Sequence, residues 1–179
     1  RWYADWMNWR SSQIGEAPDD WNAGKVLSLA LYMSVRLIRP SLIVETGTAN
    51  GSSAAAILAA LEANKFGILH TFDVHDFELK YVPKNYMSLV NKHVIRTRNA
   101  LESWISKNRN LINSTSIFFH DSNHSYEHQL WEYRLAKKYG FGILISDDVD
   151  DSRAFMDFRV PEKRILIDGE KLIGLCKLS

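Results

Sequence analysis

The sequence predicts an α/β protein, a three-layer α/β/α sandwich whose mostly parallel sheet ends in a C-terminal antiparallel hairpin. Short apolar runs rich in β-branched residues alternate with segments of helical period along most of the chain, which is the pattern of a parallel sheet covered on both faces. Four of these runs end in acidic residues. The last two runs are separated by Asp168-Gly169, a dipeptide typical of a tight hairpin turn.

Length and composition limit the protein to one core and a locally recognised partner. A chain of 179 residues, 46% of them hydrophobic, supports a single full core. The net charge of +1 provides no overall field that would attract nucleic acid or an anionic membrane. The single cysteine, Cys176, and the lack of a membrane-spanning run predict a cytoplasmic location. The chain begins with Arg1 instead of methionine, which leaves open whether further sequence precedes it.

The first 40 residues are expected to form an aromatic arm followed by a helix, ahead of a ligand-binding domain over residues 41–179. Two interpretations of the arm remain open: a packing arm that covers the sheet or a second subunit in a homodimer, and an aromatic lid over a substrate. The helix is predicted at Val26–Ile38, and Pro40 ends it. The arm carries four of the six tryptophans, Trp2, Trp6, Trp9 and Trp21.

The centre of the predicted fold is a strand, a tight turn and a helix around Glu45. The apolar run that starts at Leu42 stops at this acid, passes Gly47 and Gly51, and becomes a helix over Ala54–Asn64. Glycines allow an abrupt turn and the close approach of a ligand to the helix N-terminus. The spacing fits neither a dinucleotide loop nor a phosphate-binding loop. The alternative is a glycine turn that only joins a strand to a packed helix.

The remaining elements follow the same alternation. Acids or hairpin residues mark the ends of the strands, and charged or glycine residues mark the ends of the helices. Strands are predicted at Ile68–Phe72, His93–Arg98, Ile117–His120, Gly142–Ile145, Arg164–Ile167 and Lys171–Lys177, and helices at Tyr86–Val90, Leu101–Lys107 and Tyr126–Tyr139.

Acids at the carboxyl ends of parallel strands should meet at one edge of the sheet. Asp73 ends the second predicted strand, where a carboxylate can accept hydrogen bonds from the two ribose hydroxyls of a nucleoside. Asn99 follows the third predicted strand and is either a contact for an adenine edge or a turn-forming asparagine.

A second group of acids, Asp121, Asp147 and Asp148, predicts a divalent cation. Three carboxylates that face one point repel one another unless a cation lies among them, and oxygen ligands suit Mg²⁺. The alternative is a helix cap beside a solvated acidic turn, which the neighbouring Asp150 and Asp151 favour. An EF-hand loop is excluded by its required glycine and glutamate positions. A zinc site at His120, His124 and His128 is disfavoured, because His120 lies on the strand.

The pattern Glu-x-Gly-x-x-x-Gly-x-Ser over Glu45–Ser53 resembles motif I of the class I methyltransferases that use S-adenosylmethionine. The stretch His120–Glu127, followed by Asp147-Asp148, resembles the metal-dependent O-methyltransferases of the catechol and caffeoyl-CoA type, and more closely the sugar and macrolide type. This resemblance covers about residues 42 to 178 and implies a Rossmann-like methyltransferase fold.

The resemblance also implies roles for single residues. Glu45, Gly47 and Ser53 would contact the methionine end of the cofactor, and Asp73 its ribose. Mg²⁺ would be held by Asp121, Asp147 and Asp148. The catechol and caffeoyl-CoA enzymes place a lysine three residues after the first metal-binding acid, where this chain has His124. A histidine titrates near neutral pH and can act as a base; equally, His124 could cap the following helix.

The predicted function is therefore an S-adenosylmethionine-dependent O-methyltransferase that acts, with Mg²⁺, on a hydroxyl of a small molecule such as a sugar, a macrolide or a catechol-like diol. Neither nucleic acid nor a membrane is an expected partner. Two alternatives remain: an enzyme similar to the proteins known as cephalosporin hydroxylases, which share this fold, and a non-catalytic binding or assembly module.

Overall fold

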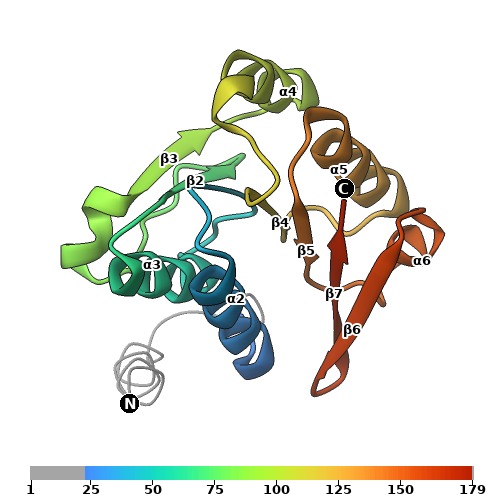
Figure 1. Cartoon of the computed structure of the whole chain (residues 1–179), viewed down its shortest axis with the longest axis horizontal. Helices are drawn as coiled ribbons and strands as arrows, with labels where there is room; N and C mark the ends of the chain where they lie inside the picture. Colours follow the sequence, from blue (N-terminus) through green and yellow to red (C-terminus); the bar gives the residue numbers. More distant parts are fainter. Residues whose placement is uncertain (1–22, 179) are drawn as a thin grey trace.

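A computed structural model of the chain describes residues 23–178, which form one seven-stranded sheet with helices on both faces (Figure 1). The strands are β1 (Leu42–Thr46), β2 (Ile68–Asp73), β3 (Val90–Val94), β4 (Ile117–His120), β5 (Ile143–Ser146), β6 (Glu162–Asp168) and β7 (Lys171–Lys177). The helices are α2 (Lys25–Ile38), α3 (Ser52–Asn64), α4 (Arg98–Lys107), α5 (Tyr126–Tyr139) and α6 (Ala154–Asp157), with 3₁₀ turns η2 (Lys84–Leu89) and η3 (Arg109–Leu111).

The order of the strands places a topological switch at the centre of the sheet. The order is β3-β2-β1-β4-β5-β7-β6; β1 to β5 pair in parallel, and β7 is antiparallel to both β5 and β6. From β1 the chain builds outward through β2 and β3, then returns to add β4 and β5 on the other side. The predicted fold class is confirmed, including the C-terminal antiparallel hairpin. Ligands bind at such a switch in open α/β sheets.

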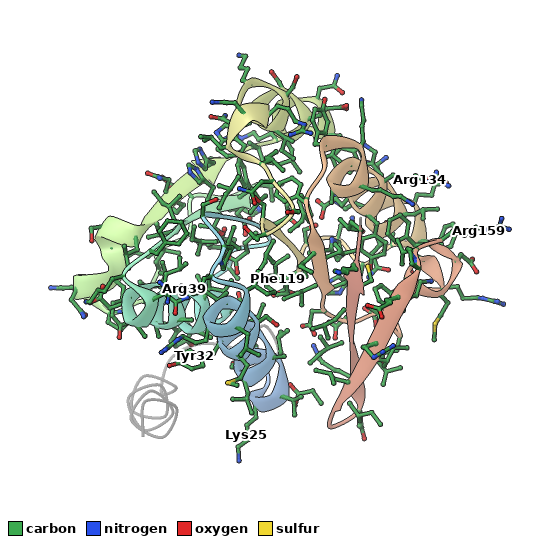
Figure 2. The ribbon with its side chains drawn as sticks, in the orientation of Figure 1. Lys25, Tyr32, Arg39, Phe119, Arg134 and Arg159 are labelled. Atoms are coloured by element: carbon green, nitrogen blue, oxygen red, sulfur yellow. The ribbon has the colours of Figure 1, made fainter. Side chains whose placement is uncertain are left out.

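The sheet separates two hydrophobic cores, because successive side chains of a strand point to opposite faces. Ile43 and Phe119 pack with α2 and α3 on one face, whereas Val44 and Phe118 pack with α4, α5 and α6 on the other. Figure 2 shows Phe119 in the interior, while Arg134 and Arg159 point away from the molecule. A buried sheet of this kind explains why β1 and β4 are apolar without alternation.

The alanine-rich sequence of α3 suits its position between α2 and the sheet. Nearly all of this helix is buried, including the run from Ser52 to Leu61. Small side chains let it approach both neighbours closely, and alanine is also the strongest helix former. Both ends of the helix have left-handed residues, Gly51 at the N-cap and Lys65 at the C-cap.

The predicted boundaries were wrong mainly around β3. The predicted strand His93–Arg98 starts three residues and ends four residues later than β3, and the predicted helix Tyr86–Val90 overlaps the 3₁₀ turn η2. β3 is an edge strand with no fully buried residue, so its sequence lacks the apolar run that marks the inner strands. Helix α4 begins at Arg98 instead of Leu101, because Thr97 caps it by accepting a hydrogen bond from the Ala100 N–H at 3.2 Å.

The predicted segments at Ile117–His120, Tyr126–Tyr139 and Lys171–Lys177 match β4, α5 and β7. The short helix α6 was not predicted. The tryptophan arm, with Trp2, Trp6, Trp9 and Trp21, lies outside the described residues, so its two interpretations stay predictions, as does the division at residue 40. Within residues 23–178, the helices are too short or too polar to cross a membrane.

Candidate functional site

A cavity of about 700 Å³ opens at the carboxyl edge of the parallel strands. Its volume lies within the roughly 300–1,000 Å³ usual for small-molecule sites. The lining comes from the loops that follow β1, β2, β3, β4 and β5, with Trp131 and Glu132 of α5 and Lys171 of β7. The predicted residues that line it are Gly47, Ser53, Asp73, Asp121, His124, Asp147 and Asp148.

Gly47 is required by the approach of a neighbouring loop. Its φ is +87°, and a Cβ at this position would lie 1.8 Å from the carbonyl oxygen of Asp121. The loop after β1 therefore touches the loop after β4, which carries the first predicted metal ligand. Gly51, with a φ of +81°, starts α3, and a Cβ there would meet Leu79 and Val82 at 3.1 Å. In this structure both glycines serve contacts between protein segments.

Glu45 does not line the cavity itself but is hydrogen-bonded to Ser53, which does. The side chain is fully buried and accepts a hydrogen bond from the Ser53 hydroxyl at 2.6 Å, while its other oxygen, Oε2, has no partner. Burial raises the pKa of Glu45 to about 7. Glu45 therefore holds Ser53, which faces the cavity, at the start of α3.

Asp73 holds the glycine loop from the neighbouring strand. One carboxylate oxygen, Oδ2, accepts the N–H groups of Thr48 at 2.9 Å and Ala49 at 3.0 Å, and Oδ1 accepts that of His75 at 3.1 Å. The predicted acid at the end of β2 is present at the cavity wall. Its contact with a ribose stays a prediction.

Asn99 does not line the cavity, so its contact with an adenine edge stays a prediction. This residue is exposed in the first turn of α4 and is absent from the cavity lining. The wall after β3 is formed instead by residues 95–98. The Arg98 Cζ atom lies 5.1 Å from the Trp131 ring centroid, and its Nη2 atom lies 3.5 Å from His128 Nδ1. Because α4 starts at Arg98, Asn99 belongs to the helix and not to the loop after β3 in which it was predicted.

The three predicted metal ligands, Asp121, Asp147 and Asp148, all line the cavity, directly after β4 and β5. Backbone hydrogen bonds continue the sheet past its strands, from Asp121 N to Thr46 O at 2.9 Å and from Asp147 N to His120 O at 3.0 Å. Burial and the charges of Asp147, Glu45 and Asp148 raise the pKa of Asp121 well above its usual range. Burial and the charge of Asp148 raise the pKa of Asp147 to about 6. The carboxylates are thus close enough to repel one another.

His124 lies against Asp121, Asp147 and Asp148, together called the acidic group. Its Nδ1 is 3.2 Å from Asp148 Oδ2 and 3.3 Å from Asp151 Oδ2, and its Nε2 is 3.8 Å from Asp121 Oδ1. Nε2 is buried and has no hydrogen-bond partner. Burial lowers the pKa of His124, but the hydrogen bond to Asp148 and the charges of the aspartates outweigh it, so the pKa is raised.

Within residues 23–178, the potential ligand atoms of His124, Asp148 and Asp151 lie within 4.8 Å of one another. This set shares Asp148 with the predicted metal ligands, includes His124 and Asp151, and does not include Asp121 or Asp147. In the sequence interpretation Asp151 favoured the alternative of a solvated acidic turn. Asp148 adopts a left-handed φ of +45°, and its Oδ2 also accepts the ammonium of Lys171 at 3.0 Å. Asp148 is therefore surrounded by cationic and acidic groups at once.

Two charged residues of the cavity lining, Glu132 and Lys171, were not identified in the sequence. The Glu132 carboxylate is 2% exposed and accepts Thr46 Oγ1 and His120 Nδ1 at 2.6 Å each, His128 Nε2 at 3.0 Å and Ser122 Oγ at 3.2 Å. The four-residue spacing of His128 and Glu132 on a helix was the available signal. Lys171 gave no signal, because only tertiary structure brings β7 to this edge.

The fold and the site define a Rossmann-like α/β protein with a ligand cavity at the switch point. Residues 44–149, more than half of the chain, match the protein family described as methyltransferase domain. The chain belongs to this family, and the predicted enzyme class, a methyltransferase, is confirmed. The comparison with curated proteins found no match.

Solved structures share the fold at low sequence identity. The O-methyltransferase TomG from Streptomyces achromogenes, in complex with SAM, is 18% identical with a TM-score of 0.63, over 89% of this chain and 82% of that one. An O-methyltransferase from Bacillus cereus in complex with SAH is 13% identical with a TM-score of 0.64, over 97% of this chain and 89% of that one. The TDP-rhamnose 3'-O-methyltransferase CalS11 is 16% identical with a TM-score of 0.61, over 85% of this chain and 77% of that one.

Proposed function

We propose that this protein transfers a methyl group from S-adenosylmethionine to a hydroxyl of a small molecule, with the help of Mg²⁺. The observation that carries the proposal is that one cavity is lined both by the loop after β1 and by the acidic group with His124. One part suits a methyl donor, and the other suits a hydroxyl acceptor. Structures with this fold include TomG, described in complex with SAM, and CalS11, described as an enzyme that methylates a sugar.

The donor would occupy the side of the cavity formed by the glycine loop and the N-terminus of α3. Thr48 and Ser53 line this side, and Asp73 stands at the end of the adjacent strand. The N-terminus of a helix offers unpaired N–H groups to a carboxylate such as that of the methionine end. Glu45 acts here through Ser53, which it orients by accepting its hydroxyl hydrogen bond.

The acidic group fits a hard cation. Its ligand atoms would be carboxylate oxygens. Burial and the repulsion between the carboxylates both raise the pKa of Asp121 and of Asp147. A positive charge would relieve this repulsion. Asp121, Asp147 and Asp148 would hold Mg²⁺, with Asp151 beside them. S-adenosylmethionine supplies an already activated methyl group, and Mg²⁺ supplies a charge that lowers the pKa of an acceptor hydroxyl.

His124 would take the proton of the acceptor hydroxyl. Its Nδ1 faces Asp148 and Asp151, which orient the ring, and its buried Nε2 is left without a partner in the cavity wall. A cation on the aspartates would offset the charges that raise the pKa of His124. The imidazole, neutral with its proton on Nδ1, would then carry a lone pair on Nε2, the atom that would accept the proton. We infer an acceptor with vicinal hydroxyls, as in a sugar, a macrolide or a catechol-like diol, because two adjacent oxygens bind a cation best.

The test is methyl transfer from S-adenosylmethionine to a panel of sugars, macrolides and catechols, followed by mass spectrometry with and without Mg²⁺. We expect a Mg²⁺-dependent product that Asp147→Asn abolishes. His124→Gln should lower kcat by about 10²- to 10⁴-fold, while calorimetric binding of S-adenosylhomocysteine is retained. Glu127→Gln, an exposed change on α5, is the control. A protein that binds neither S-adenosylmethionine nor S-adenosylhomocysteine would contradict the proposal.

A further inference from the structure

Lys171 places a positive charge among the aspartates of the acidic group. Its Nζ donates to Asp148 Oδ2 at 3.0 Å, and the residue lines the same cavity. It is the first residue of β7, on the antiparallel hairpin, so it reaches the site from outside the parallel part of the sheet.

The backbone fixes the position of Lys171 relative to Asp148. Leu172, the next residue, exchanges two hydrogen bonds with the loop that follows β5: its carbonyl accepts the Val149 N–H at 2.9 Å, and its N–H donates to Asp150 Oδ1 at 2.8 Å. The hairpin is held a second time by Asp168, whose Oδ2 accepts two N–H groups at the start of α2. Backbone hydrogen bonds therefore hold the Lys171–Asp148 ion pair in place, unlike a pair between two mobile surface side chains.

Lys171 is paired with one predicted metal ligand, Asp148, and lines the same cavity as the other two, Asp121 and Asp147. The side chain of Asp148 is 12% exposed and that of Lys171 is 48% exposed. The carboxylate is therefore held in a sheltered position, whereas the long, flexible lysine can withdraw from it toward water.

We propose that Lys171 is a built-in counter-charge that competes with the divalent cation for Asp148 and so sets the cation affinity of the site. This inference rests on the proposed function, because it assigns the cation to Asp148. An ammonium and a dication that share one carboxylate repel each other, so each weakens the binding of the other, and this coupling is reciprocal. In the absence of the cation, Lys171 neutralises a group of acids that would otherwise repel one another.

The test is calorimetric titration of Mg²⁺ into the full chain in the presence of S-adenosylhomocysteine. Removing the charge with Lys171→Met should tighten Mg²⁺ binding at least about fivefold, the lower end of usual coupling between two ligands. Lys171→Arg keeps the charge and should bind Mg²⁺ like the wild type. Lys177→Met removes an exposed lysine from the other end of the same strand and is the matched control. Circular dichroism checks folding, and Lys171→Gln carries the same expectation if Lys171→Met does not fold.

Three outcomes overturn the inference, and they have different consequences for the proposed function. If Mg²⁺ binds the wild type and Lys171→Met equally, Lys171 is an ordinary ion pair and the proposed function stands. If Lys171→Met binds Mg²⁺ more weakly, the lysine supports Asp148 and does not compete for it, and the proposed function again stands. If neither protein binds Mg²⁺, the inference fails together with the cation part of the proposed function.

Discussion

At the scale of single residues, Glu45 makes stability depend on pH. Burial raises its pKa from 4.5 to about 7. Because the folded state binds the proton more tightly than the unfolded state, the contribution of Glu45 is fully present below pH 4.5 and is lost as the pH rises through about 7. The difference of roughly 2.5 units corresponds to about 3 kcal/mol. We expect Glu45→Gln to remove this loss, so that the stability difference between pH 5 and pH 8 becomes smaller than in the wild type.

Urea unfolding of both proteins at the two pH values measures this difference. Glu62→Gln is the matched control, because Glu62 is a partly exposed glutamate on α3 whose ion pair is with the exposed Lys65. If the free energy of unfolding changed equally between pH 5 and pH 8 in the wild type and in Glu45→Gln, Glu45 would be ionised in the folded protein throughout this range.

A second prediction at this scale concerns the contact between the loops after β1 and β4. We expect Gly47→Ala to cost at least about 3 kcal/mol, since the new Cβ would add a clash with Asp121 to the cost of a left-handed backbone. Gly169→Ala separates the two effects. Its φ is +67° and nothing lies within 4 Å of the added Cβ, so it should cost only about 1 kcal/mol. Equal costs in urea unfolding would contradict the role of the clash.

At the scale of elements, the hairpin is tied to the first described helix. The Asp168 carboxylate accepts the N–H groups of Val26 at 3.1 Å and Leu27 at 3.0 Å, and so caps α2 from a residue 141 positions away. The N-cap residue, Gly24, has no side chain and makes no cap hydrogen bond of its own. We expect Asp168→Ala to destabilise the protein by about 1 kcal/mol. Glu170→Ala, an exposed change in the same turn, is the control, and thermal unfolding that does not distinguish the two would argue against the cap.

The elements also show how far the sequence could be interpreted. Inner strands such as β4 and long amphipathic helices such as α5 were predicted with their exact bounds, because both have strong periodic patterns. The edge strand β3 was misplaced, since one of its sides has no neighbouring strand and its residues are only partly buried. The acids at the strand ends were found from the rule that parallel strands end together. Lys171 and the cap by Asp168 depend on the antiparallel hairpin, whose position in the sheet no local pattern encodes.

At the scale of the whole molecule, Glu132 joins the two halves of the site. It lies on α5, and it binds Thr46 at the end of β1 and His120 at the end of β4. Burial opposes the ionisation of Glu132, but its contacts with His120 and His128 outweigh burial and lower the pKa of Glu132. Burial also lowers the pKa of His120, and both side chains are hidden from water. Thr46 precedes Gly47, and His120 precedes Asp121. Through its two contacts Glu132 therefore fixes the position of the loop after β1 relative to the loop after β4.

Glu132→Ala should affect stability and binding together. Removing a buried carboxylate that satisfies several donors costs about 3 kcal/mol or more, and the ends of β1 and β4 would lose their common partner. We expect urea unfolding to show this loss, and calorimetry at a temperature where the variant is folded to show weaker binding of S-adenosylhomocysteine. Glu127→Ala, on the exposed side of the same helix, should change neither. A destabilised variant that binds the cofactor product with unchanged affinity would show that Glu132 supports the fold without positioning the site, because each strand end would then hold its own loop.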